Sequence, residues 1–135
     1  MALGLDVGSK TIGVAVTDEA GVCAHAVTTL SRRGTIRDVE TVRALVAKYS
    51  IEQVVVGMPY ELDGSEGRRA ERVRVFYEAL CATGLRAELW DERYSSADAE
   101  VALLEANVSR ARRKELIDKL AARVILQSWL DAHQK

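Results

Sequence analysis

A single carboxylate, Asp6, interrupts the first apolar run of the chain, GLDVGSKTIGVAV at residues 4–16. An ionised aspartate in a buried sheet is costly unless a cation or hydrogen-bond donors compensate its charge. Strand alternation places Gly4, Asp6 and Gly8 on one face, so the acid has small neighbours and open space above it. This pattern favours the close approach of a metal ion or a phosphate. The alternative is a carboxylate that is hydrogen-bonded to amides of the following turn.

A second acidic position lies at the end of a strand-like segment, residues 85–92, which finishes in Asp91-Glu92-Arg93. Open α/β sheets bind their ligands at the carboxyl ends of the strands. Alternation does not choose between Asp91 and Glu92, because helices can cover either face of such a sheet. A simple ion pair between Arg93 and one of these acids is the structural alternative.

A third acid, Asp118, lies in the helix that is expected over about 113–132. It stands beside the apolar stripe of that helix, and the alanines at 121 and 122 leave room around it. These neighbours are typical of an acid that points toward the sheet. A surface acid that serves only solubility is the alternative.

Three acids that come from two strands and one helix can converge on one point. Ligand sets made only of oxygen suit Mg²⁺ or Mn²⁺. Two such ions, about 3.5–4 Å apart, can activate water and stabilise the leaving oxygen in phosphodiester hydrolysis. His25 and His133 are isolated, so the sequence offers no cluster for zinc.

The elements that must position these acids follow a simple order. Apolar runs predict strands, at 2–7, 12–18, 22–30, 53–59 and 85–92. Helical spacing predicts helices, beginning near Asp38 and covering about 67–83, 95–107 and 113–132. Short turns join the first three strands into an antiparallel meander, and helices separate the later, parallel strands. We therefore expect one α/β domain over 1–135, with a mixed five-stranded sheet flanked by helices.

The composition is that of a folded protein, with 48% hydrophobic and 29% charged residues. No apolar run approaches the roughly 20 residues that a bilayer requires, and the start of the chain does not resemble a signal peptide. The two cysteines, Cys23 and Cys81, have no metal-ligand spacing. We expect both to be buried in a protein of the reducing cytosol.

A net charge of -1 argues mildly against a nucleic-acid ligand. The basic residues are clustered, however, and clusters can form a basic face. The three groups are Arg32, Arg33 and Arg37; Arg68, Arg69, Arg72 and Arg74; and Arg110, Arg112, Arg113, Lys114, Lys119 and Arg123. Solvated helix faces explain any one of these groups equally well.

Two phosphate-binding patterns are close to the first turn, Gly8-Ser9-Lys10-Thr11. The spacing of a P-loop is absent, which excludes that motif. The order of Asp6, Gly8 and a hydroxyl is similar to the phosphate loop of actin-like and sugar-kinase ATPases. Those proteins need two such domains to enclose a nucleotide, and this chain has room for one.

Four segments in this order, GLDVGSKTIGVAVTD, VVVGMPYELDGSEG, LWDERYSSADAE and IDKLAARVILQSWLD, resemble the YqgF family, also called RuvX. The resemblance covers essentially the whole chain, and the family is described as Holliday-junction resolvases and as nucleases that mature the 5′ end of precursor 16S ribosomal RNA. It implies a ribonuclease H-like fold and a bacterial cytoplasmic protein. It further implies Asp6, Glu92 and Asp118 as catalytic, metal-binding acids, which favours Glu92 over Asp91. Met58 and Tyr94 depart from the common pattern without touching this chemistry.

The leading hypothesis is a Mg²⁺- or Mn²⁺-dependent endonuclease that cuts structured nucleic acid, either a four-way DNA junction or precursor rRNA. Lys10, Arg93 and Lys114 are candidate phosphate contacts. Symmetric cleavage of a junction would require a homodimer, since each strand needs its own active site. The competing hypotheses are a non-catalytic nucleic-acid or ribosome-assembly binding module, and an actin-like nucleotide-binding domain.

Overall fold

The computed structural model describes residues 1–92 and 110–133, with side chains described for 1–92 and 120–133. Its elements are β1 (Ala2–Val7), β2 (Thr11–Thr17), β3 (Ala24–Ser31), α1 (Thr35–Lys48), β4 (Gln53–Met58), α2 (Arg68–Ala82), β5 (Ala87–Asp91) and α4 (Arg110–His133). The helix expected at 95–107 lies outside the described residues. None of the described helices combines the length and apolar character needed to cross a bilayer.

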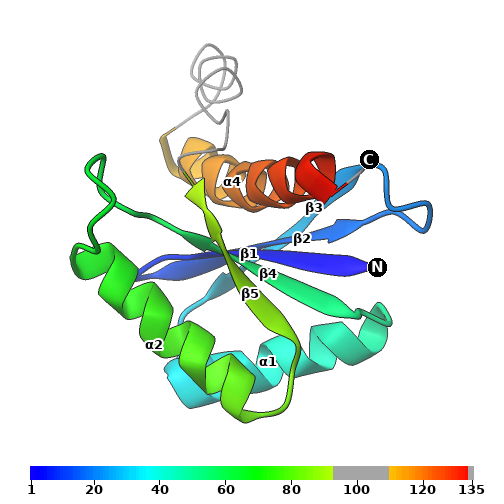
Figure 1. The fold of residues 1–135 in the computed structure, drawn as a ribbon, viewed down its shortest axis with the longest axis horizontal. Coiled ribbons are helices and arrows are strands. Elements are labelled where there is room, and N and C mark those ends of the chain that lie inside the picture. The colour runs from blue at the N-terminus through cyan, green and yellow to red at the C-terminus, as the bar shows by residue number, and fades with distance from the viewer. Residues whose placement is uncertain (93–109, 134–135) are drawn as a thin grey trace.

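The five strands form one sheet in the order β3-β2-β1-β4-β5 (Figure 1). The pairs β1–β2 and β2–β3 are antiparallel, whereas β1–β4 and β4–β5 are parallel. This arrangement confirms the predicted meander followed by parallel strands. It brings the carboxyl ends of β1, β4 and β5 to the same edge of the sheet.

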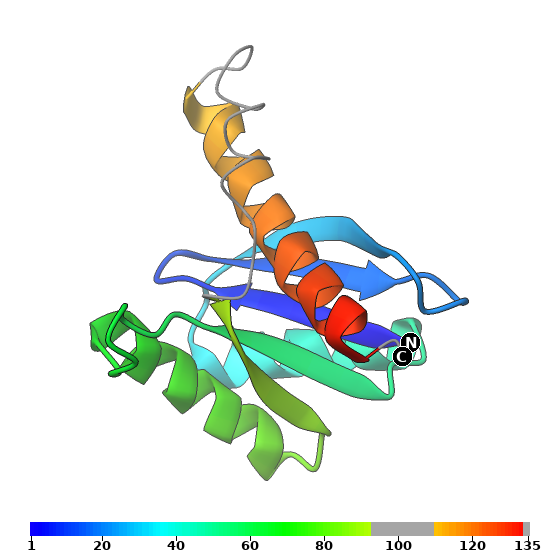
Figure 2. The ribbon, with the colours of Figure 1, turned by 45° about the horizontal axis from the view of Figure 1, so that its top comes forward.

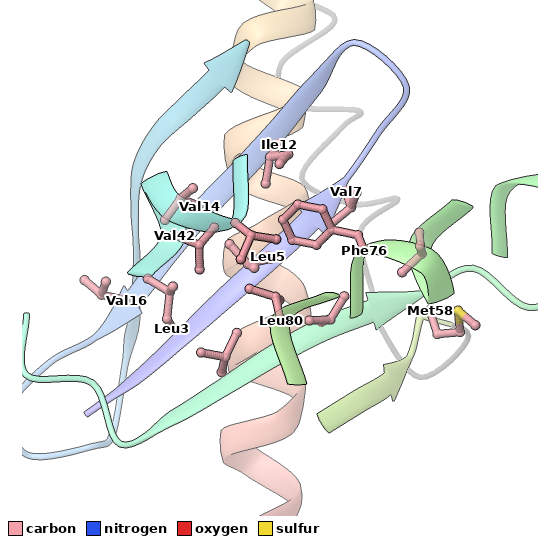
Figure 3. Close-up of a cluster of buried hydrophobic side chains, with 14 of the residues drawn as sticks. Leu3, Leu5, Val7, Ile12, Val14, Val16, Val42, Met58, Phe76 and Leu80 are labelled. Carbon is pink, nitrogen blue, oxygen red and sulfur yellow. The ribbon is translucent and has the colours of Figure 1, made fainter. Parts of the chain in front are cut away.

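One face of the sheet is covered by α1 and α2, and its large apolar side chains form the main core (Figures 1 and 3). Leu3, Leu5 and Val7 point to this face from β1, as alternation predicted. Phe76 and Leu80 of α2 are fully buried against them. In this core β1 packs against the α1–α2 layer, and within the sheet it lies between β2 and β4.

The opposite face carries α4, which crosses the sheet diagonally (Figure 2). Small residues of the strands allow the helix to come close; the cluster comprises Ala2, Ala15, Ala24 and Val55 with Ala122, Ile125, Leu126 and Leu130. A Cβ atom added to Gly4 would lie 2.7 Å from Leu126 Cβ and 3.1 Å from the Ala122 carbonyl oxygen. The space that was expected to stay open for a ligand at Gly4 is therefore filled by α4, and that part of the prediction was wrong.

Gly4→Ala is expected to lower the free energy of unfolding by about 1–3 kcal/mol, the usual cost of overpacking a core. The obstacle is a Cβ atom and a carbonyl of the helix, neither of which can move without shifting α4. Urea unfolding of the metal-free protein measures the effect. Gly57→Ala is the comparison, because its added Cβ would first meet the movable end of the Ile125 side chain. Equal stability of Gly4→Ala and the parent chain would contradict this account.

Arg32, predicted only as part of a basic cluster, holds three elements together. Its Nε donates to Asp38 Oδ2 at 2.7 Å, and its Nη1 donates to the Gly8 carbonyl oxygen at 2.8 Å. The guanidinium also lies 5.4 Å from the centre of the Phe76 ring. Asp38 is only 3% exposed, and its second oxygen accepts a hydrogen bond from the Arg33 amide. Arg32 therefore fixes the β1–β2 turn, beside Asp6, to the first turn of α1.

The cysteines correct another expectation. Cys23 and Cys81 are both exposed free thiols rather than buried residues. Cys81 follows the buried Leu80 in α2, and one step along a helix turns a side chain through about 100°, away from the core. Cys23 lies in the turn before β3, where the backbone is at the surface.

Candidate metal centre

Asp6 and Glu92 are brought together on the face of the sheet that α4 covers. Asp6 is the second-last residue of β1, and Glu92 directly follows β5. Their strands are separated by β4, in which Gly57 follows Val56, the partner of Leu5, and is in register with Trp90, two residues before Glu92. Glu92 Oε1 lies 2.8 Å from where a Cβ of Gly57 would be. The glycine thus leaves the space through which Glu92 reaches Asp6.

The two carboxyl groups share a hydrogen bond, and the pKa of Glu92 is raised from an ordinary 4.5 to about 7. Burial is the largest cause, followed by the negative charge of Asp6. The guanidinium of Arg69 acts in the opposite direction. Near neutral pH Glu92 therefore carries a proton for part of the time, in a place where a cation would compensate the charges of both acids.

Strand register separates Glu92 from Asp91, which the alternation argument alone left open. Ala87 and Leu89 of β5 pack against the core on the α1–α2 side. Asp91 lies two residues after Leu89 and therefore points to the same side of the sheet as Ala87 and Leu89. It is also in register with the buried Met58. Glu92, not Asp91, therefore shares a side of the sheet with Asp6.

The structure describes the other predicted site residues only in part. Asp118 and Lys114 belong to α4, but their side chains lie outside those that the structure describes. Arg93 falls wholly outside the described residues. Lys10 is exposed in the β1–β2 turn, where its carbonyl oxygen accepts the Arg32 amide. Among the described side chains, no group of three His, Cys, Asp or Glu residues is placed to hold a metal.

Sequence reasoning missed two residues of this region. Gly57 was only one residue of the strand predicted at 53–59, although its lack of a side chain is what admits Glu92. Arg69 was counted within a basic cluster, yet its charge acts on Glu92. With Arg72 it lines a hollow of about 100 Å³ whose other walls are Val7, Gly8 and Ser9. The signal in the sequence was the spacing of three between the two arginines, which places them on one side of α2.

Comparison with known proteins gives this geometry a context. Residues 1–132 match the model of the family described as "RuvX: Holliday junction resolvase". A relative from Myxococcus xanthus, named "Putative pre-16S rRNA nuclease", is 49% identical over 98% of this chain and 88% of its own. A relative of the same name from Symbiobacterium thermophilum is 51% identical over 96% and 90% of the two chains.

Solved structures show the same fold at low identity. RuvC from Thermus thermophilus in complex with a Holliday junction substrate aligns with a TM-score of 0.61 at 15% identity, covering 97% of this chain and 94% of the other. The fowlpox virus resolvase in complex with Holliday junction DNA aligns with a TM-score of 0.55 at 9% identity over 99% of both chains. These matches confirm the ribonuclease H-like fold, and with the match of residues 1–132 they place the chain in the RuvX family.

Proposed function

We propose that this RuvX-family chain is a divalent-metal-dependent endonuclease of the bacterial cytoplasm that hydrolyses phosphodiester bonds in structured nucleic acid. The observation that carries the proposal is the contact between Asp6 and Glu92. The two acids are 86 positions apart in the sequence (92 − 6), and they share a hydrogen bond on one side of the sheet. Two neighbouring carboxylates repel each other unless a proton or a cation lies between them.

The donor set fits Mg²⁺ or Mn²⁺, since both described ligands are carboxylates and such hard cations bind oxygen. We propose Asp118 as the third ligand. Ala122 packs over Gly4, and Asp118 lies one helical turn before it, whereas Asp6 lies two strand residues after Gly4. Both offsets correspond to roughly 6 Å, from the rise of a helix and of a strand. This correspondence supports placing Asp118 at the level of Asp6.

When bound, one or two such ions would activate water and neutralise the charge that develops on the leaving oxygen. The residues of this chain orient the ligands and limit access to them. Gly57 lets Glu92 approach Asp6, and Ile125 of α4 packs against the same glycine and closes that side. The Lys10 side chain, in the exposed β1–β2 turn, is a candidate contact for the substrate backbone.

Two substrates follow from the relatives, a four-way DNA junction and the 5′ end of precursor 16S rRNA, and both present the same phosphodiester chemistry. Cleavage of the two symmetric strands of a junction would also require a homodimer. A single assay should compare both substrates with Mg²⁺, with Mn²⁺ and with chelator. We expect cleavage of at least one substrate, and only with metal present.

Asp6→Asn is expected to reduce that cleavage by more than roughly 100-fold, since even the loss of an outer-shell partner of a metal ligand typically costs 10–100-fold. Mn²⁺ binding, followed by calorimetry, should weaken in parallel. Glu19→Gln is the matched control, because Glu19 is exposed in the turn at the opposite end of β2. Full activity of Asp6→Asn would refute the metal centre. Metal-independent binding without any cleavage would instead support a non-catalytic binding module.

A further inference from the structure

The hollow between the β1–β2 turn and α2 adjoins the proposed metal centre on two sides. Val7 in its wall directly follows Asp6 in β1, and Arg69 in its wall is the guanidinium whose charge acts on Glu92. Its volume of about 100 Å³ is well below the roughly 300–1,000 Å³ of pockets that hold drug-sized ligands. A space of this size suits one small group.

The wall of the hollow is chemically suited to an anion. Arg69 and Arg72 are three residues apart in α2, and both are exposed. Neither forms an ion pair with a carboxylate in the part of the chain that the structure describes. The Ser9 hydroxyl, on the other wall, also has no hydrogen-bond partner among the described residues.

Two other arginines of these clusters, by contrast, are held in ion pairs. Arg32 binds Asp38 at 2.7 Å, and Arg74, further along α2, binds Glu66 at 2.6 Å. The N-cap of α2, Gly67, provides no side-chain hydrogen bond to the amides of the first turn, and the Glu61 carboxylate lies beside this glycine. The hollow thus combines two guanidinium groups and a hydroxyl beside two acids that need a cation.

We propose that this hollow binds a backbone phosphate next to the scissile phosphate of the strand that the metal centre cleaves. The inference rests on the proposed nuclease function and adds to it the path that the substrate strand takes across the protein surface. A strand held this way runs from Asp6 and Glu92 across the β1–β2 turn toward the start of α2. Arginine suits this task, because its planar fork matches the oxygens of a phosphate.

Arg72→Gln is the cleaner test, since Arg69, and not Arg72, is among the main influences on the pKa of Glu92. Binding of the full chain to the DNA junction and to the precursor rRNA is measured by fluorescence anisotropy, with chelator present to prevent cleavage. We expect Kd to rise about fivefold or more near 0.1 M salt, and the slope of log Kd against log salt to fall by about 1 on the junction. Arg43→Gln is the control, because it removes the same charge from an exposed ion pair on α1.

Substrates that carry one neutral methylphosphonate identify the phosphate concerned. The parent chain should bind less tightly when one particular phosphate is neutralised. Arg72→Gln should bind the substrate that is neutral at that position as tightly as it binds the unmodified substrate. A loss of affinity in Arg72→Gln with DNA, with RNA or with both would support the proposal, and a loss with only one of them would also identify the substrate. Equal effects of Arg72→Gln and Arg43→Gln would overturn it. So would a variant that binds inorganic phosphate less well but both nucleic acids normally.

This test remains informative if the nuclease proposal itself fails. The binding measurements need no cleavage, so a parent chain that cuts neither substrate would refute the nuclease and leave the phosphate site open to measurement. Conversely, a chain that cuts with metal but shows no dependence on Arg72 would retain the metal centre and lose this inference. The two proposals are therefore tested separately.

Discussion

Glu92→Gln is expected to abolish metal-dependent cleavage and, at the same time, to stabilise the metal-free protein at neutral and alkaline pH. The loss of cleavage should exceed roughly 100-fold, because the variant lacks one of the two described carboxylates. The gain in stability has a separate cause. A glutamine amide can donate to Asp6 as the protonated acid does, and it never acquires the charge that Asp6 repels.

The sign of the pH dependence follows from the raised pKa of Glu92, about 7 in the fold against an ordinary 4.5. Between these values the folded protein binds more protons than the unfolded chain, so the free energy of unfolding falls as pH rises through this window. The shift corresponds to at most about 3 kcal/mol, lost once the pH exceeds 7. Glu92→Gln should remove this contribution, which makes its stability less dependent on pH between 5 and 8.

Urea unfolding at several pH values, with chelator present, measures this difference. Addition of Mg²⁺ or Mn²⁺ should then stabilise the parent chain more than Glu92→Gln, because a ligand stabilises only the fold that binds it. Glu19→Gln again provides the control for the loss of one exposed carboxylate. A Glu92→Gln chain that is less stable than the parent at pH 8 would contradict the view that the two carboxylates repel each other.

Asp38→Ala is expected to lower the free energy of unfolding by about 3–5 kcal/mol, the usual cost of leaving one partner of a buried ion pair without the other. Asp38 accepts hydrogen bonds from Arg32 Nε and from the Arg33 amide, and both donors would lose their acceptor. The Arg32 side chain is only 18% exposed, so water replaces the lost carboxylate poorly. The effect is measured by thermal or urea unfolding.

Glu40→Ala is the matched control on the same helix. Glu40 and its partner Arg43 are 61% and 48% exposed, and exposed pairs contribute about 0–1 kcal/mol. A second test replaces both members of the buried pair with apolar residues, Arg32→Met with Asp38→Leu, which should cost less than Asp38→Ala alone. If Asp38→Ala costs no more than Glu40→Ala, Arg32 does not hold the β1–β2 turn as described.

The sequence was informative where local pattern determines structure. Alternation along β1 correctly separated Leu3, Leu5 and Val7 from Gly4 and Asp6, and turn signals correctly predicted the antiparallel meander. The resemblance to RuvX proteins selected Glu92, and the register of β5 gives the physical reason. Alternation and turn signals are properties of short segments, whereas the resemblance rests on four segments taken together.

Features that depend on distant packing could not be read in this way. The role of Gly4 depends on Leu126, which lies on a helix that alternation in β1 does not reveal. From the sequence, Arg32 resembled any other surface arginine. Its role in holding the fold together becomes visible only from its hydrogen bonds to Asp38 and to the Gly8 carbonyl oxygen. The exposure of Cys81 likewise depends on which side of α2 meets the sheet. Each of these three features depends on how two separate elements of the fold pack against each other.

The packing of α4 on the first strand has a consequence for how the protein is made. Ribosomes deliver a chain from its N-terminus, so β1 to β5 emerge before the helix that covers Ala2, Ala15 and Val55. Until α4 arrives, that face of the nascent sheet stays exposed to water and to other chains. The acid proposed at position 118 also emerges with this helix. The proposed nuclease would therefore become active only after α4 has been synthesised and has packed on the sheet.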